Sequence, residues 1–218
     1  MKFDIINYSI VIVGREYAPN KINHDYLKSA KIVKKDWEQA EVPVYTPSYS
    51  IVKYTNGIVF ATERNKLQIV DNKPPLEETE FRISELAEKL VQKIDSVQHS
   101  ALGVNIAVIS ERSDSDNFLI NKFLKPGKWV DNGLESASVN LAYSFKEAKL
   151  RVNCDTGIDL TQQPQRQGVL VAANYNFDIS GAPSLEAGQK KVLRAVKDFK
   201  SYHEHFLALI NDIFSEGS

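Results

Sequence analysis

The sequence predicts an α+β protein with a mainly antiparallel sheet covered by helices. Segments rich in Ile and Val and bounded by Gly, Pro or Asn predict strands. Segments with apolar residues three and four positions apart predict helices. Strands that can pair with their neighbours in the chain, with helices over one face, form this class of fold. Neither of the common Gly-rich phosphate-binding motifs occurs, which argues against a nucleotide-binding fold.

The first half of the chain is predicted to contain a strand, a helix, three strands and a second helix. Asn23 is expected to cap the first helix, and Asn56-Gly57 is expected to form a tight two-residue turn between two strands. In chain order, these elements are expected at 4–13, 24–35, 49–55, 58–62, 67–70 and 83–97.

The same order is predicted to begin again in the second half. Elements are expected at 101–110, 116–124, 137–145, 149–155 and 169–179, and a long C-terminal helix follows them. Apolar residues recur along this helix at helical spacing, so it is expected to pack along the sheet. Its stripe consists of Val192, Val196, Phe199, His203, Phe206, Ile210 and Ile213.

The shared order predicts a duplicated unit, with one copy at residues 1–98 and the other at 99–218. Corresponding elements are offset by roughly 90 to 105 residues, which is too long for a solenoid repeat. The halves show no residue-level identity, so this prediction depends on element order alone. It requires that the two halves superpose with matching strand order, either as two units or within one compact domain.

Composition indicates an ordinary globular protein of a reducing compartment. The 27 basic and 28 acidic residues nearly cancel, and a net charge of −1 does not indicate nucleic acid binding. A single cysteine, Cys154, excludes an intramolecular disulfide. The apolar run at 8–13 is too short for a membrane span or a signal-peptide core. We therefore expect a cytoplasmic protein that does not bind membranes.

Three segments of the chain resemble a sporadically distributed family of uncharacterised bacterial α+β proteins of similar length. The segments are ALGVNI at 101–106, GVLV at 168–171 and DFKSYHEHF at 198–206. Proteins of that family carry a His and a Phe near the end of the last helix. The resemblance spans most of the chain and implies the α+β fold and a bacterial origin, and it implies no established activity.

One combination of residues suggests a metal-dependent nuclease. Asp131 and Glu147 could hold Mg²⁺, and Lys149 could support the nucleophile. This chemistry needs the Glu and the Lys on a strand beside the Asp, whereas Glu147 is predicted to lie in a turn. The nuclease is therefore an alternative hypothesis, and no catalytic residue or metal ligand is assigned.

Three other features are expected to be structural. His203 and His205 are two positions apart on a helix and point to different sides, so a shared metal is disfavoured. His203 is expected to be half-buried with a hydrogen-bonded ring, and His205 to lie on the polar side of the helix. Asp155-Thr156-Gly157 is assigned to a turn. Cys154 is expected to lie in a strand, without the electropositive setting of a catalytic thiolate.

The absence of catalytic motifs favours a non-catalytic binding or protein-interaction protein. We expect a protein partner or self-association, with no cofactor and no metal. The alternatives are the metal-dependent nuclease that uses Asp131, Glu147 and Lys149, and a structural or assembly subunit. Several tyrosines near the first predicted hairpin suit a partner surface, and they suit a sheet core equally well.

Overall fold

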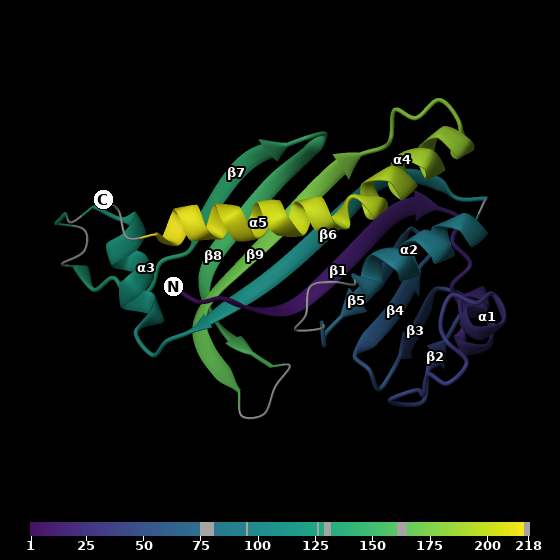
Figure 1. The fold of residues 1–218 in the computed structure, drawn as a ribbon, viewed down its shortest axis with the longest axis horizontal. Coiled ribbons are helices and arrows are strands. Elements are labelled where there is room, and N and C mark those ends of the chain that lie inside the picture. Colours follow the sequence, from purple (N-terminus) through teal and green to yellow (C-terminus); the bar gives the residue numbers. More distant parts are fainter. Residues whose placement is uncertain (75–80, 95, 126, 129–131, 161–164, 216–218) are drawn as a thin grey trace.

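The computed structural model describes residues 1–74, 81–94, 96–125, 127–128, 132–160 and 165–215. Within these residues nine strands form one sheet, accompanied by five α-helices (Figure 1). The strands are β1 Asp4–Arg15, β2 Val44–Tyr45, β3 Tyr49–Lys53, β4 Ile58–Glu63, β5 Lys66–Asp71, β6 Gln98–Glu111, β7 Val139–Phe145, β8 Ala148–Asp159 and β9 Arg166–Asp178. The helices are α1 His24–Ser29, α2 Arg82–Lys93, α3 Ser115–Phe123, α4 Leu185–Lys197 and α5 Phe199–Phe214.

The predicted α+β class is confirmed, and neighbouring strands of the described sheet all pair antiparallel. The strand order is β2-β3-β4-β5-β1-β6-β9-β8-β7. Outward from the central β1–β6 pair, the first half runs β1, β5, β4, β3 and the second half runs β6, β9, β8, β7. Both halves therefore have the same strand order, apart from the additional β2. The duplication requires this connectivity, and a common origin of the halves stays a prediction.

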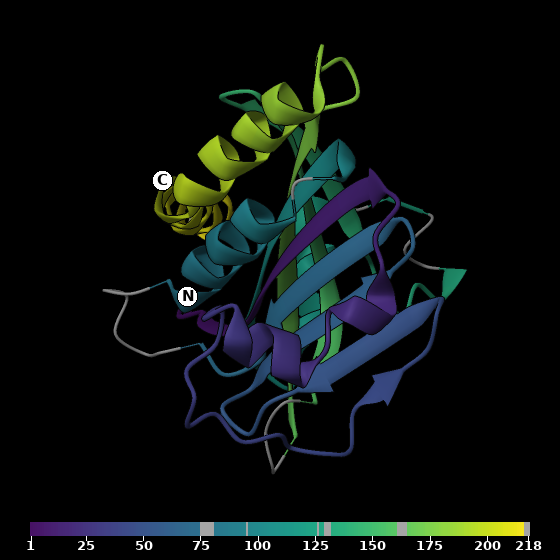
Figure 2. The same ribbon diagram turned by 90° about the vertical axis from the view of Figure 1, so that its right-hand side faces the viewer.

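Helices cover one face of the sheet. On β8 the side chains of Leu150 and Val152 are buried, whereas those of Arg151 and Asn153 are exposed on the opposite face. This alternation follows from the two-residue period of a strand. α2, α4 and α5 lie on the same side of the sheet (Figure 2). None of the described helices has the length and apolar character needed to cross a membrane.

Hydrogen bonds join α2 to α4 over the sheet. The Ser84 hydroxyl donates to the carbonyl of Val196 over 2.7 Å, and the Gln189 amide donates to the carbonyl of Val91 over 2.8 Å. α2 belongs to the first half of the chain and α4 to the second, so these side chain–backbone hydrogen bonds connect the two halves. Their apolar faces pack into the same core as the central strands.

Two elements of the first half differ in length from the prediction. The helix expected at 24–35 ends at Ser29, because Lys31 has a φ of 58° in the left-handed region. The expected two-residue turn at Asn56-Gly57 is a three-residue loop, in which the Tyr54 N–H donates to the Ile58 carbonyl. Gly57 takes the positive φ of 91°. The Asn56 side chain accepts from the Ile58 N–H instead of adopting a positive φ itself.

The predicted long C-terminal helix is two consecutive helices. α4 ends and α5 begins at Asp198, whose ψ of 7° departs from the helical value near −42°. The apolar stripe continues across this break, since Val196 and Phe199 are both buried. α5 then runs across the sheet in a direction different from that of α4 (Figure 1).

Candidate binding site

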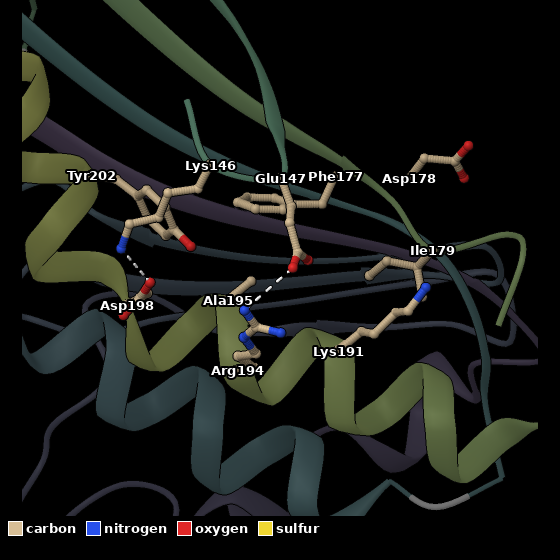
Figure 3. Close-up of a pocket in the computed structure, with 10 residues that line it drawn as sticks. All are labelled: Lys146, Glu147, Phe177, Asp178, Ile179, Lys191, Arg194, Ala195, Asp198 and Tyr202. Carbon is tan, nitrogen blue, oxygen red and sulfur yellow. Dashed lines mark hydrogen bonds and ion pairs between the residues drawn. The ribbon is translucent and has the colours of Figure 1, made fainter. Parts of the chain in front are cut away.

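A charged cavity lies among the end of β9, the turn that joins β7 to β8, and the helices α4 and α5 (Figure 3). Its volume of about 360 Å³ falls in the range of small-molecule sites. The lining residues are Lys146, Glu147, Phe177, Asp178, Ile179, Lys191, Arg194, Ala195, Asp198 and Tyr202.

Core residues form the apolar floor of this cavity. Phe177 and Ile179 are buried at the end of β9, and Tyr202 is buried on the first turn of α5. Asp178, the last residue of β9, lies between the floor residues Phe177 and Ile179, so its side chain points the other way and is exposed. The floor therefore belongs to the packed core, which holds the charged residues above it in place.

Two ion pairs join the β7–β8 turn to the helices across the cavity (Figure 3). Lys146 Nζ lies 2.6 Å from Asp198 Oδ2, and Arg194 Nη2 lies 3.2 Å from Glu147 Oε1. The side chains of Arg194 and Glu147 are 76% and 67% exposed. Exposed ion pairs contribute about 0–1 kcal/mol each. Charged groups of a ligand can therefore replace either partner at little cost in stability.

Lys191 supplies a third cation to the cavity. It makes no hydrogen bond or ion pair with any described residue, whereas its neighbour Lys190 pairs with Glu186 over 2.6 Å. Lys191 and Arg194 are three positions apart on α4 and so lie on one face of the helix. The cavity thus has Arg194, which pairs with Glu147, beside Lys191, which makes no ion pair with a described residue and whose charge interacts with that of Asp178.

Two of the cavity-lining groups, Tyr202 and Asp178, have shifted pKa values. Burial, with the nearby charges of Asp198 and Glu147, raises the pKa of Tyr202 to about 12. The hydroxyl and N–H groups of Ser180 donate to Asp178 and hold the pKa of its carboxyl below the ordinary value. Near neutral pH, Tyr202 is protonated and Asp178 ionised. General acid–base catalysis is most efficient with a pKa near the working pH, and neither group meets that condition.

The residues of the nuclease hypothesis are only partly placed. Glu147 lies in the β7–β8 turn, as predicted, and pairs with Arg194. Lys149 lies on β8, where its side chain is exposed. Asp131 lies outside the described residues. The three-residue site therefore stays a prediction.

We expect added Mg²⁺, Mn²⁺ or Zn²⁺ to leave the melting temperature unchanged. The described part of the chain contains no group of three or more His, Cys, Asp or Glu side chains that could hold a metal ion. A metal that binds only the folded state, at a hundred times its Kd, would add about 2.7 kcal/mol of stability. Thermal unfolding with and without each metal measures this. A rise that disappears in Glu147→Ala would contradict the expectation and support the nuclease.

The two histidines of α5 occupy different environments. His203 is fully buried and not half-buried as expected, and its Nδ1 lies 3.1 Å from the hydroxyl of Tyr8, which agrees with the expected hydrogen-bonded ring. His205 was assigned to the polar side of the helix, and this is wrong. Its ring stacks on Phe145 with centroids 3.7 Å apart, and its Nδ1 lies 2.8 Å from the hydroxyl of Tyr175. The partly buried end of β7 brings Phe145 against the helix, which the helical pattern alone does not reveal.

The structure also revises the assignment of Asp155-Thr156-Gly157. This segment lies within β8, not in a turn, and each of its residues has a partner on β9. Cys154 precedes it and lies in a strand, as expected. Its side chain is on the buried face of β8, and burial raises the pKa of its thiol to about 11. Cys154 is therefore protonated near neutral pH and is not an activated nucleophile.

Sequence reasoning did not identify the cavity residues Lys146, Lys191, Arg194 and Asp198. The spacing of Lys191 and Arg194 on α4 and of Asp198 directly after it, beside the apolar stripe, was the available signal. It shows a charged helix face and does not show which strand end lies opposite. Comparison of the chain with protein-family models, curated proteins and solved structures finds no match.

Proposed function

We propose that the protein is a non-catalytic binding protein whose cavity takes a small zwitterionic ligand of the amino-acid or short-peptide type. One observation carries the proposal. Lys191, which makes no hydrogen bond or ion pair with a described residue, lies beside Arg194, and Arg194 faces Glu147 across an apolar floor. This arrangement presents cations, a carboxylate and an apolar surface to a single ligand.

Each part of such a ligand has a counterpart in the cavity. A ligand carboxylate can accept from Lys191 and from the guanidinium of Arg194, which binds carboxylates through two parallel hydrogen bonds. Glu147, released from Arg194, can then accept from the ligand ammonium. An apolar side chain can rest on the floor formed by Phe177 and Ile179. The binding of both charges at once favours a zwitterion over a simple anion or amine.

The first half of the chain has an equivalent position, where the β3–β4 loop and the end of β5 correspond to the β7–β8 turn and the end of β9. The charged groups at that position are arranged differently. There, the loop between β3 and β4 and the end of β5 are joined by Arg82, which donates to Asp71, to the Asn56 carbonyl and to the Lys73 carbonyl. Asp71 is buried at that position. In the first half the cation Arg82 is paired with a carboxylate that is 1% exposed, whereas in the second half the side chains of Arg194 and Glu147 are both largely exposed.

The shifted pKa values of two cavity-lining groups support binding over catalysis. Tyr202, with its raised pKa, and Asp178, with its lowered pKa, keep a fixed charge near neutral pH. Because neither group exchanges a proton readily near neutral pH, both are suited to orienting and binding a ligand and not to acid–base catalysis.

We expect amino acids or short peptides to bind, and Lys191→Ala to weaken their binding about tenfold or more. Isothermal titration calorimetry on a panel of amino acids and dipeptides measures the affinity. Acetate, phosphate and simple amines in the same panel test whether both charges are needed. Lys190→Ala is the matched control, because Lys190 is adjacent in sequence and pairs with Glu186 outside the cavity.

Two results would contradict the proposal. Equal loss of binding in Lys190→Ala and Lys191→Ala would place the ligand elsewhere on α4. The absence of heat and of any rise in melting temperature across the whole panel would show that the cavity does not take this class of ligand.

A further inference from the structure

The two outer edges of the sheet differ in how they are protected against pairing. β2 forms one edge; it has two residues and lies between Pro43 and Pro47. An isolated bridge between Gln39 and Tyr54 pairs the residue that directly follows the neighbouring β3. Short edge strands and nearby prolines are common devices that prevent edge-to-edge association. This edge of the sheet is therefore closed to a further strand.

β7 forms the other edge and has none of these devices. Its seven residues, Val139 to Phe145, contain no charge, no Pro and no Gly. Among the described residues, β8 is the only strand that pairs with it. The backbone groups on its outer side thus face away from the sheet, and such a row is a template for a further strand.

The sequence of β7 is complementary to itself in one antiparallel register. Side chains on the helix-covered face are Val139, Leu141, Tyr143 and Phe145, and those on the other face are Asn140, Ala142 and Ser144. Pairing two copies about Ala142 places apolar residues opposite apolar residues, and small uncharged residues opposite small uncharged residues. This register also aligns all seven residues, whereas a shift in either direction leaves strand ends unpaired.

We propose that β7 is an interface through which two copies of this chain pair, edge to edge, into a continuous antiparallel sheet. The two-fold axis passes between the Ala142 residues of the two copies. Leu141 of each copy therefore lies opposite Tyr143 of the other. The partly buried Leu141 and the 37% exposed Tyr143 gain apolar neighbours. Phe145 is already fixed within its own chain by its stack on His205, so the end of the strand is ordered before pairing.

A second copy fits this edge better than an unrelated strand does. An unrelated peptide would need its own alternation of apolar and small residues, whereas a second copy supplies the match at every position. Both chains keep their helices on the same side of the joined sheet, because an axis perpendicular to the sheet preserves its faces. The interface is small, so we expect a dimer with a dissociation constant on the order of micromolar.

Charge placed at the two-fold axis tests the proposal. Ala142 is exposed, so its substitution leaves the core of the chain intact. Ala142→Lys and Ala142→Glu each put two like charges directly opposite, and we expect each to raise the dissociation constant at least about tenfold. Arg151 is the partner of Ala142 on β8, so the lysine variant is the more disruptive of the two. A mixture of the two variants should form a heterodimer.

Sedimentation equilibrium measures these dissociation constants, and circular dichroism confirms that each variant is folded. Val44→Lys on the opposite edge is the matched control and should dimerise as the wild type does. A wild type that is monomeric at every concentration would overturn the proposal. So would a dimer that Val44→Lys disrupts and Ala142→Lys leaves intact.

Cysteine cross-linking tests the register. The native Cys154 is buried and does not compete. Ala142→Cys should cross-link with itself, whereas Asn140→Cys and Ser144→Cys should cross-link with each other and not with themselves. Self-linking of Asn140→Cys in preference to the mixed pair would show that the chains do not pair about Ala142.

Discussion

Replacement of Phe199 or Phe206 with alanine is expected to lower the free energy of unfolding by about 3–5 kcal/mol. Both side chains have no exposed surface. The Phe199 ring contacts Tyr8 of β1 and Phe81 before α2, with ring centroids 5.1 Å apart in each case. Phe199→Ala therefore leaves a cavity between α5, β1 and the residue that precedes α2. Domains are stable by about 5–15 kcal/mol, so each variant should lose a large part of the total, as urea unfolding measures.

His205→Ala is the control for the same helix, and we expect a loss of about 1 kcal/mol. The helical pattern alone predicts almost no effect, because it places His205 on the polar side. The contact with Phe145 and the hydrogen bond with Tyr175 raise that expectation. If Phe199→Ala and Phe206→Ala were both neutral, the stripe would be a partner-binding face and not part of the core.

Local patterns in the sequence predicted most elements and not their arrangement. Strands such as β1 and β6 carry alternating apolar residues that are visible in the chain. Their pairing is a long-range event, since Tyr8 lies opposite Ile106. The break at Asp198 was missed because the apolar stripe continues across it. β2 was missed because two residues carry no periodicity.

The candidate cavity was beyond sequence reasoning for a related reason. Its residues come from a turn, a strand end and two helices, and no two of these are joined by a motif. Glu147 was singled out for a metal site, and the structure shows that its partner is the cation Arg194. Two adjacent lysines illustrate the limit: Lys191 lines the cavity and Lys190 does not, although the sequence gives both the same charge and helix.

Replacement of Arg82 with alanine is expected to lower the free energy of unfolding by about 3 kcal/mol. Its Nε and Nη2 donate to the two carboxylate oxygens of Asp71, each over 2.6 Å. Nη2 also donates to the carbonyls of Asn56 and Lys73, which ties the β3–β4 loop to the chain after β5. Asp71 is 1% exposed, so the variant leaves a buried carboxylate with no cation. Arg82 itself is 24% exposed, which allows some water to enter and limits the loss.

Urea unfolding of three further variants tests whether the loss of stability in Arg82→Ala comes from the buried carboxylate that loses its cation, and not from the loss of an ion pair as such. Lys190→Ala breaks a pair whose side chains are both 73% exposed, and it should cost less than about 0.5 kcal/mol. Asp71→Leu combined with Arg82→Met removes both charges and should recover part of the loss, because an apolar pair needs no compensation. Asp71→Leu alone should be less stable than the double variant. If Arg82→Ala were as stable as Lys190→Ala, the buried carboxylate would have another source of compensation, and Arg82 would not be what closes this corner of the sheet.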